Sequence, residues 1–319
     1  MNWETKITKL LDIRYPIIQG GLAHLAYADL AAAVSNAGGL GQVTAMSLKN
    51  PELLKEELRK TKAMTKHPFA VNFAIGSHDR PFIPYVEAAL EEGMSIATIT
   101  GGNPKPVFDA LEGTGVKIIV LVAAVRQAQK AEELGADAVI VVGQEGGGHL
   151  GRDDLGTMVL VPRVVDAVNI PVVASGGIGD GRGLMAALSL GAEGVEMGTR
   201  FIAVKECVGA NDVYKQSLID ATERDTVVIK RSLGAPARAL SNHWTDKILE
   251  MEKQQMGYEG LKDYISGYSN KKYIHEGNKD EGYAWAGQVA GLIQDIPTVS
   301  ELFDKMIGEA DQIRKKWQQ

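Results

Sequence analysis

The sequence has little of what marks secreted and membrane proteins. It contains one cysteine, Cys207, in 319 residues, so no internal disulfide can form, and a lone thiol fits a reducing compartment. No apolar run approaches the roughly 20 residues of a membrane span. Charges are scattered through the N-terminal MNWETKITKLLDIRYP, which argues against a signal peptide. We therefore expect a cytoplasmic protein without membrane contact.

Excess positive charge and metal-binding motifs are also missing. The net charge is −6 at pH 7 and the pI is about 5.6, whereas proteins held on nucleic acid by phosphate contacts need a basic face. The chain has no HExxH, no paired cysteines and no DxDxDG loop, the common signatures of zinc and calcium sites. We expect neither a nucleic-acid partner nor a bound metal.

Short β-type runs alternate with longer amphipathic stretches. Eight apolar runs of four to six residues, most of them β-branched, cover 16–19, 39–44, 68–73, 95–100, 117–122, 138–143, 171–176 and 194–199. Helical patterns lie between them, as at 28–38, 51–64, 125–137 and 181–193. Eight successive βα units without a hairpin signal predict an α/β fold of the TIM-type (β/α)8 barrel class. An open doubly wound sheet is the alternative, because it shares this local pattern.

The pattern changes after about residue 209. The segment to about 275 is rich in tyrosine and charge and has no strand run, which predicts several helices outside the barrel. We therefore expect a barrel made of residues 1–208 and 276–319, with 209–275 as an added, mostly helical subdomain covering the barrel mouth. The tail after 283 has helical periodicity and is expected to return to the barrel wall.

Glycines follow several predicted strands, at the end of the barrel where active sites lie. Those after the seventh and eighth strands, in SGGI and GT, predict a phosphate site built from backbone N–H groups. By itself this pattern also fits a barrel that binds a phosphorylated ligand without redox chemistry. The stretch VVGQEGGGHLGRDD, residues 141–154, follows the sixth strand. Its glycines would admit a flat ring system, with His149 at the ring edge, so the two features together describe a flavin mononucleotide site.

Several motifs together resemble one known family. PIIQGG, AAAVSNAGGLG, PFAVNF, GADAVIVVGQEGGGHLG, IPVVASGGIGDGRGLMAALSLGAEGVEMGTRF and the later WAGQ are similar to the nitronate monooxygenase (2-nitropropane dioxygenase) family. That family includes an NAD(P)H:quinone reductase class and the flavin-dependent enoyl-[acyl carrier protein] reductase II. The resemblance covers about residues 14–206 and returns at 284–292.

The resemblance implies an FMN-dependent monooxygenase or oxidoreductase whose active-site histidine is His149, with NAD(P)H as a further candidate electron donor. Its substrate would be a small molecule: a nitronate oxidised with O2, a quinone, or an enoyl thioester. The matching motifs place FMN contacts at Gly20, Gly21, Asn72, Gly147, Gly177, Glu196, Met197, Gly198 and Thr199. A homodimer is the default expectation.

The sequence departs from the family pattern at three positions, one of them the small change of Gly146 for the usual alanine. Val142 stands where many members carry a glutamine, and His24 stands where the two reductase classes tend to carry tryptophan. The run H-x-G-x-D-D, residues 149–154, is shared with the quinone-reductase class. His24 is left open between facing the ring and being an ordinary polar residue of the first loop.

Overall fold

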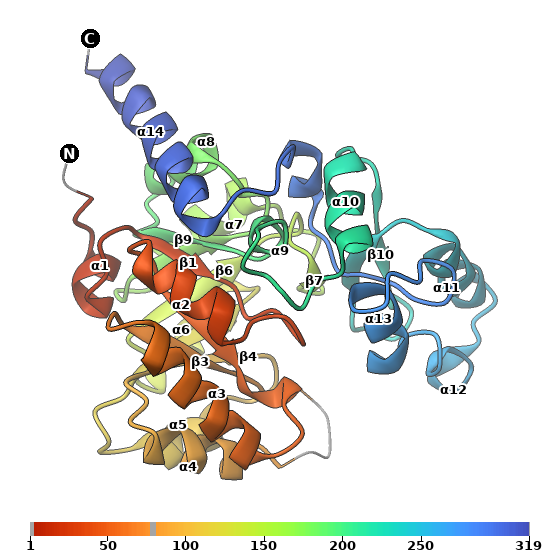
Figure 1. Ribbon diagram of the computed structural model, residues 1–319, viewed down its shortest axis with the longest axis horizontal. Helices are drawn as coiled ribbons and strands as arrows, with labels where there is room; N and C mark the ends of the chain where they lie inside the picture. The colour runs from red at the N-terminus through yellow and green to blue at the C-terminus, as the bar shows by residue number, and fades with distance from the viewer. Residues whose placement is uncertain (1–2, 77–80, 319) are drawn as a thin grey trace.

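Eight parallel strands form a barrel in the computed structural model, which describes residues 3–76 and 81–318 (Figure 1). The strands are β1 (Ile17–Gln19), β2 (Gly41–Thr44), β3 (Phe69–Ala74), β4 (Ile96–Thr100), β5 (Lys117–Val122), β6 (Ala138–Val142), β8 (Val172–Ser175) and β9 (Gly194–Met197). They are hydrogen-bonded in the order β1-β9-β8-β6-β5-β4-β3-β2. Each lies within two residues of a predicted strand, so the eight strand positions are confirmed.

The sheet is closed between its first and last strands. The Gln19 N–H donates to the Leu40 carbonyl at 2.9 Å, and the Leu40 N–H donates to the Ile17 carbonyl at 2.9 Å. These bonds form a parallel bridge beside β2. An open doubly wound sheet has no such contact, so the predicted TIM-type barrel is confirmed.

Helices surround the barrel. They are α2 (Ala28–Asn36), α3 (Pro51–Met64), α4 (Ile83–Glu91), α5 (Lys105–Leu111), α6 (Val125–Glu133), α7 (Thr157–Val165), α8 (Gly181–Ser189), the short α9 (Thr199–Ile202) and α14 (Val299–Trp317), with 3₁₀ turns at Ala45–Ser47 and Gln288–Leu292. The C-terminal α14 packs on α8, as expected for a tail that returns to the wall. A Cβ at Gly181 would lie 2.5 Å from the Met306 carbonyl oxygen, so this contact requires glycine.

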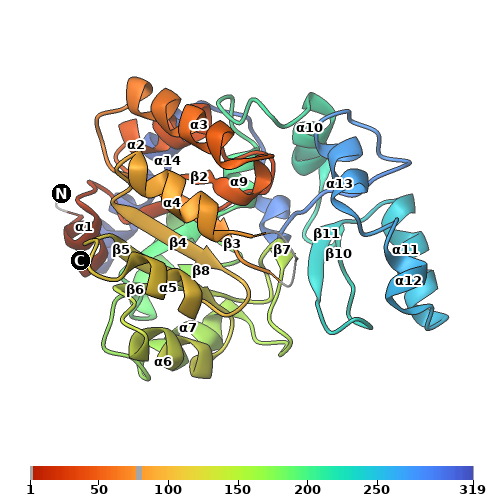
Figure 2. The ribbon, with the colours of Figure 1, turned by 90° about the horizontal axis from the view of Figure 1, so that it is seen from below.

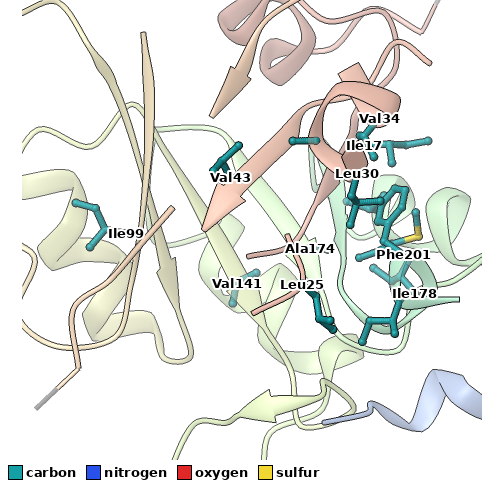
Figure 3. Close-up of a cluster of buried hydrophobic side chains, with 14 of the residues drawn as sticks. Ile17, Leu25, Leu30, Val34, Val43, Ile99, Val141, Ala174, Ile178 and Phe201 are labelled. Carbon is teal, nitrogen blue, oxygen red and sulfur yellow. The ribbon is translucent and has the colours of Figure 1, made fainter. Parts of the chain in front are cut away.

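Apolar side chains fill both sides of the barrel wall. Outside, strand residues pack against the helices; Figure 3 shows Ile17 of β1 with Leu30 and Val34 of α2. Inside, a second cluster includes Ile18 and Ile140, and it is covered at the N-terminal ends of the strands by α1 (Lys6–Leu11) through Ile7 and Leu11. The strands are buried on both faces, which explains their continuous apolar runs.

The segment 209–275 contains a hairpin that the sequence analysis did not predict. Its helices are α10 (Asp212–Asp220), α11 (His243–Lys253), α12 (Gly257–Leu261) and α13 (Gly267–Ile274); between α10 and α11 lie β10 (Thr226–Ile229) and β11 (Ala237–Leu240). β10 is β-branched throughout and could have been recognised. β11 reads ARAL, a sequence with little strand propensity, and its other edge pairs with the two-residue β7 (Gly148–His149).

The hairpin belongs to a small core of its own beside the barrel (Figure 2). The residues buried there are Ile229, Ala239, Ile248 and Leu261 together with Tyr283. Tyr283 comes from residues 275–298, which lead from α13 back to α14 on the barrel and which we call the returning segment. That returning segment also forms an antiparallel bridge from Trp285 to Ala239. We call the hairpin together with α11–α13 the outer arm. It meets the barrel at β7, next to the C-terminal ends of the strands.

Candidate active site

The predicted cofactor residues of the first, third and last strands lie together at the C-terminal end of the barrel. The Gly20 N–H donates to the Met197 carbonyl at 2.8 Å, which joins the turn after β1 to the end of β9. A Cβ at Gly21 would lie 2.5 Å from Asn72 Oδ1. The absent side chain of Gly21 therefore leaves room for the amide of Asn72, two residues before the end of β3.

A network of buried polar side chains forms the floor of this site. The side chain of Gln42 donates to the Gln19 carbonyl at 2.6 Å, and the Gln42 N–H donates to Gln19 Oε1 at 3.0 Å. Asn72 Nδ2 donates to the hydroxyls of Thr98 and Thr100, each at 3.0 Å, and the Thr98 hydroxyl donates in turn to Gln42 Oε1. These bonds fix the side-chain amides, as buried polar groups require. Gln42 and Thr98 were not predicted as site residues, although a glutamine within an apolar strand is a visible signal.

Glu196 of β9 is a buried carboxyl group beside this floor. It is 6% exposed and accepts a hydrogen bond from the Ser175 hydroxyl at 2.9 Å. Burial raises the pKa of Glu196 to about 7, and its hydrogen bonds to Ser175 and Gln42 offset part of that rise. Near neutral pH the carboxyl therefore exists in both protonation states.

The turns after β8 and β9 offer backbone donors. Gly176 and Gly177 have φ of +96° and +75°, a region that L side chains avoid. Within the described residues, the N–H groups of Gly177, Ile178 and Gly198 donate to no protein acceptor. The Thr199 hydroxyl accepts from the Gly287 N–H at 2.9 Å and so holds the returning segment against the β9 turn.

The glycines of the stretch 141–154 pack closely against other parts of the chain. A Cβ at Gly147 would lie 2.6 Å from the Gly287 nitrogen, and one at Gly146 would lie 2.8 Å from Val142 Cγ2. The glycine run therefore first makes room for the returning segment and for Val142. Gly148 has φ of +76° and no neighbour within 4 Å of a Cβ. The Glu145 carboxylate accepts from the Thr157 N–H and hydroxyl at 2.9 Å, so it caps α7.

His149 lies where the outer arm meets the barrel. It is exposed, its ring centroid is 5.7 Å from that of Trp285, and its Nε2 is 2.9 Å from Lys230 Nζ. Lys230 follows β10 and is only 8% exposed. Burial lowers the pKa of the Lys230 ammonium to about 8, although the charge of Glu252 offsets part of that effect. Neither Lys230 nor Trp285 was predicted as a site residue.

The remaining histidines and the cysteine make contacts of their own. His24 has φ of +65°, its N–H donates to Ser47 Oγ at 2.9 Å, and its ring lies 6.4 Å from that of His275 on the outer arm. His67, His243 and His275 are exposed, and His78 lies outside the described residues. Cys207 is fully buried, and burial raises its pKa to about 11, which makes it a poor nucleophile.

A cavity of about 480 Å³ lies at the opposite end of the barrel. Its lining includes Pro68 and Ser95, which directly precede β3 and β4, and the charged residues Lys62 and Glu92. Active sites of (β/α)8 barrels lie at the C-terminal ends of the strands, so this cavity is not the candidate site. Among residues 3–76 and 81–318 there is no group of three or more histidine, cysteine or acidic side chains arranged to hold a metal. Nor does that part contain a helix both apolar and long enough to cross a membrane.

The site fits a flavin better than a small phosphorylated ligand alone. The turns after β8 and β9 supply unpaired donors for a phosphate, and the polar floor under Gly21 supplies amides and hydroxyls for a heterocycle. A closed (β/α)8 barrel with such a mouth, and with an exposed histidine at its edge, defines the class of protein as a barrel enzyme.

Comparison with known proteins identifies the family. A family model described as nitronate monooxygenase matches residues 4–81 and 78–309. A probable nitronate monooxygenase of Staphylococcus saprophyticus is 33% identical over 99% of this chain and 100% of its own. A (3aS,4S,5R,7aS)-5-hydroxy-7a-methyl-1-oxo-octahydro-1H-indene-4-carboxyl-CoA dehydrogenase of Rhodococcus jostii is 33% identical over 96% of this chain and 95% of its own. FabK from Thermotoga maritima matches in structure with a TM-score of 0.91 and 39% identity, covering 99% of this chain and 98% of its own. The chain belongs to the nitronate monooxygenase family of flavin-dependent oxidoreductases.

Proposed function

We propose that this chain binds FMN and oxidises alkyl nitronates with O2. The observation that carries the proposal is the exposed imidazole of His149, whose segment is joined through Gly287 to the turn after β9 at the mouth of the barrel. The two are connected through the returning segment: the Gly287 N–H donates to Thr199 of the β9 turn, and Gly287 also packs on Gly147, two residues before His149. The family that the chain belongs to carries the same chemistry in its name.

The chain's own residues would hold the cofactor and orient the substrate. N–H groups of the turns at 176–178 and 198–199 would bind the phosphate, while Gly20, Gly21 and Asn72 would lie against the ring system. When bound, FMN would take two electrons from the substrate and pass them to oxygen. His149 would orient the nitro group or take the α-proton of a neutral nitroalkane, since an imidazole titrates near neutral pH.

The test is anaerobic stopped-flow absorbance of the purified yellow protein. We expect rapid loss of the oxidised-flavin absorbance on mixing with propionate 3-nitronate, and little change with NADH or NADPH. Reoxidation on admitting air should then complete the cycle. Rapid bleaching by a nicotinamide together with no response to the nitronate would overturn the proposal. A preparation without bound flavin, even after incubation with FMN, would overturn the cofactor assignment as well.

A second candidate is the NAD(P)H-dependent reduction of an enoyl thioester. It is supported by 39% identity, over nearly the full length, to FabK, an enoyl-[acyl carrier protein] reductase II. It is also supported by the Rhodococcus relative, whose name specifies a coenzyme A thioester. In the same stopped-flow experiment this activity would appear as bleaching by a nicotinamide and recovery on adding crotonyl-CoA. Recovery with a quinone alone would indicate the quinone-reductase class instead.

A further inference from the structure

The turn after β10 holds Lys230 in an unusual backbone conformation. Lys230 has φ of +63°, which costs an L residue other than glycine about 1 kcal/mol or more. Glu252 of α11 fixes this turn with both carboxylate oxygens. Oε2 accepts from the Lys230 N–H at 2.8 Å, and Oε1 accepts from the N–H and hydroxyl of Ser232 at 2.9 and 2.7 Å. The conformation is therefore stabilised from outside the turn.

The ammonium group of Lys230 is buried without a matching carboxylate. Its Nζ lies 2.9 Å from His149 Nε2 and 5.3 Å from the centroid of the Trp285 ring. Glu252 is the acidic residue near enough to affect its charge, but the oxygens of Glu252 are bonded to the backbone and hydroxyl of the turn. In the part of the chain that the structure describes, Lys230 forms no ion pair. A buried cation with only neutral rings beside it favours an anionic ligand.

The short contact between Lys230 and His149 constrains their protons. A lysine ammonium has only donors, and a protonated imidazole has only donors. At 2.9 Å one nitrogen must accept, so the two side chains cannot both be charged while this bond is made. In the state with a charged lysine, Nε2 of His149 accepts and its remaining proton lies on Nδ1.

We propose that Lys230 and His149 share one proton and together bind the anionic oxygen of the substrate, with Glu252 as the residue that positions Lys230. The substrate class rests on the proposed function; the proton sharing does not. One consequence is specificity. Because Lys230 occupies Nε2, that nitrogen is a poor base for the α-proton of a neutral nitroalkane, whereas the positive charge favours a substrate that arrives already ionised.

Replacing Lys230 tests the anion site. Lys230→Met keeps the length of the side chain and the backbone strain but removes the charge. We expect KM for propionate 3-nitronate to rise about 10- to 100-fold, the loss of one charge-assisted hydrogen bond, with FMN content unchanged. Lys230→Arg should recover part of this loss because it keeps the charge. A KM within twofold of wild type in Lys230→Met would overturn the proposal, as would equal kcat/KM for the nitronate and its parent nitroalkane.

The pH dependence gives a second kinetic readout. The groups that face the Lys230 ammonium are His149 of β7, Glu252 of α11 and the Trp285 ring. In wild type, KM for the nitronate should rise above about pH 8, where the ammonium loses its proton. The rise should move to higher pH in Lys230→Arg. A profile identical in the two proteins would contradict the role of Lys230.

Long-range ¹H–¹⁵N NMR of the holoenzyme tests the proton sharing without substrate. We expect the His149 ring to be the Nδ1–H form at pH 7 and its shifts to change near pH 8. Lys230→Met should shift His149 toward the Nε2–H form that free imidazole prefers. No change of tautomer in that variant would disprove the sharing of a proton between Lys230 and His149. If the proton is shared but no nitronate is oxidised, the proposed function fails and the proton sharing stands.

Glu252 is tested as a positioning residue with its own control. Glu252→Gln keeps one acceptor oxygen, whereas Glu252→Ala removes both, so KM should rise about threefold in the first variant and about tenfold in the second. The pH above which KM rises should be lower in both variants than in wild type, because the charge of Glu252 that favours the lysine ammonium is lost. Glu250→Ala on the same helix alters only contacts with Lys253 and Gln254 and should behave as wild type. Equal effects of Glu252→Ala and Glu250→Ala would refute positioning.

Discussion

The barrel floor and the outer arm build the two sides of the candidate site in different ways. On the floor, Gln42 of β2 hydrogen-bonds both to Gln19 of β1 and to Thr98 of β4. The arm brings Lys230 to His149 across 81 positions of the chain, and Lys230 is held there by Glu252. The floor belongs to the repeating fold and suits a constant cofactor, whereas the arm adds the charge that would select the substrate.

The largest effect is expected at the junction of the two regions. His149→Gln keeps the size of the side chain but cannot carry a charge or transfer a proton. We expect kcat/KM for the nitronate to fall about 10²- to 10⁴-fold, the loss of two hydrogen bonds to charged groups, the substrate anion and Lys230, at about 1.5–3 kcal/mol each, with FMN retained. Steady-state oxygen uptake measures it. His243→Gln, at an exposed histidine of α11, is the matched control. A loss of FMN equal to the loss of activity would mean that His149 belongs to the floor.

A substitution at Glu196, beside the floor, should change the stability of the protein rather than its choice of substrate. The folded-state pKa of Glu196 is raised from 4.5 to about 7, so the folded protein binds its proton more tightly than the unfolded chain does. Wild type therefore loses stability as pH rises from about 4.5 to 7. The Glu196→Gln variant has no carboxyl group at this position, so this pH dependence is absent from it. Its stability relative to wild type should increase by roughly 3 kcal/mol between pH 4.5 and pH 8, at about 1.36 kcal/mol per pKa unit. Denaturant unfolding at the two pH values measures it, and a pH-independent difference would contradict it.

Cofactor affinity should depend on the floor at Gly21. In Gly21→Ala the new methyl group would lie 2.5 Å from Asn72 Oδ1, and Asn72 is held by Thr98 and Thr100. We expect FMN to bind about tenfold more weakly, roughly 1.4 kcal/mol, while KM for the nitronate in the FMN-saturated variant changes little. Fluorescence titration of the apoprotein with FMN measures this affinity. Unchanged FMN affinity would remove Gly21 from the cofactor site.

The smallest effect is expected far from both regions. Gly308 is exposed within α14, and a Cβ there would meet nothing within 4 Å. Gly308→Ala should therefore stabilise the protein by about 0.5–1 kcal/mol, because alanine has the higher helix propensity. Thermal unfolding measures the change, and activity and FMN content should stay as in wild type. A destabilised variant would show that residue 308 of α14 is restricted by something other than atoms within 4 Å of its Cβ position.

The fold was largely predictable from the sequence, but the outer arm was not. Strands buried on both faces leave continuous apolar runs, and a cap such as Asn50 before Pro51 marks a helix start. β11 had no comparable signal, because its ARAL sequence forms a strand only between β10 and β7. β10 differs from β11 in this respect, because its four β-branched residues make it recognisable as a strand from the sequence.

The sequence by itself determined the barrel, the family and the position of His149, because these depend on local periodicity and on motifs contiguous in the chain. It also placed glycines at the strand ends. Only the tertiary structure decided what those glycines adjoin, with Gly147 packed on Gly287, and which charge His149 meets. Lys230 lies in a turn that looks ordinary in sequence, and contacts between distant segments are not encoded in any local pattern. Closure of the barrel and packing of the arm bring those segments together, so the charge beside His149 is a property of the folded chain.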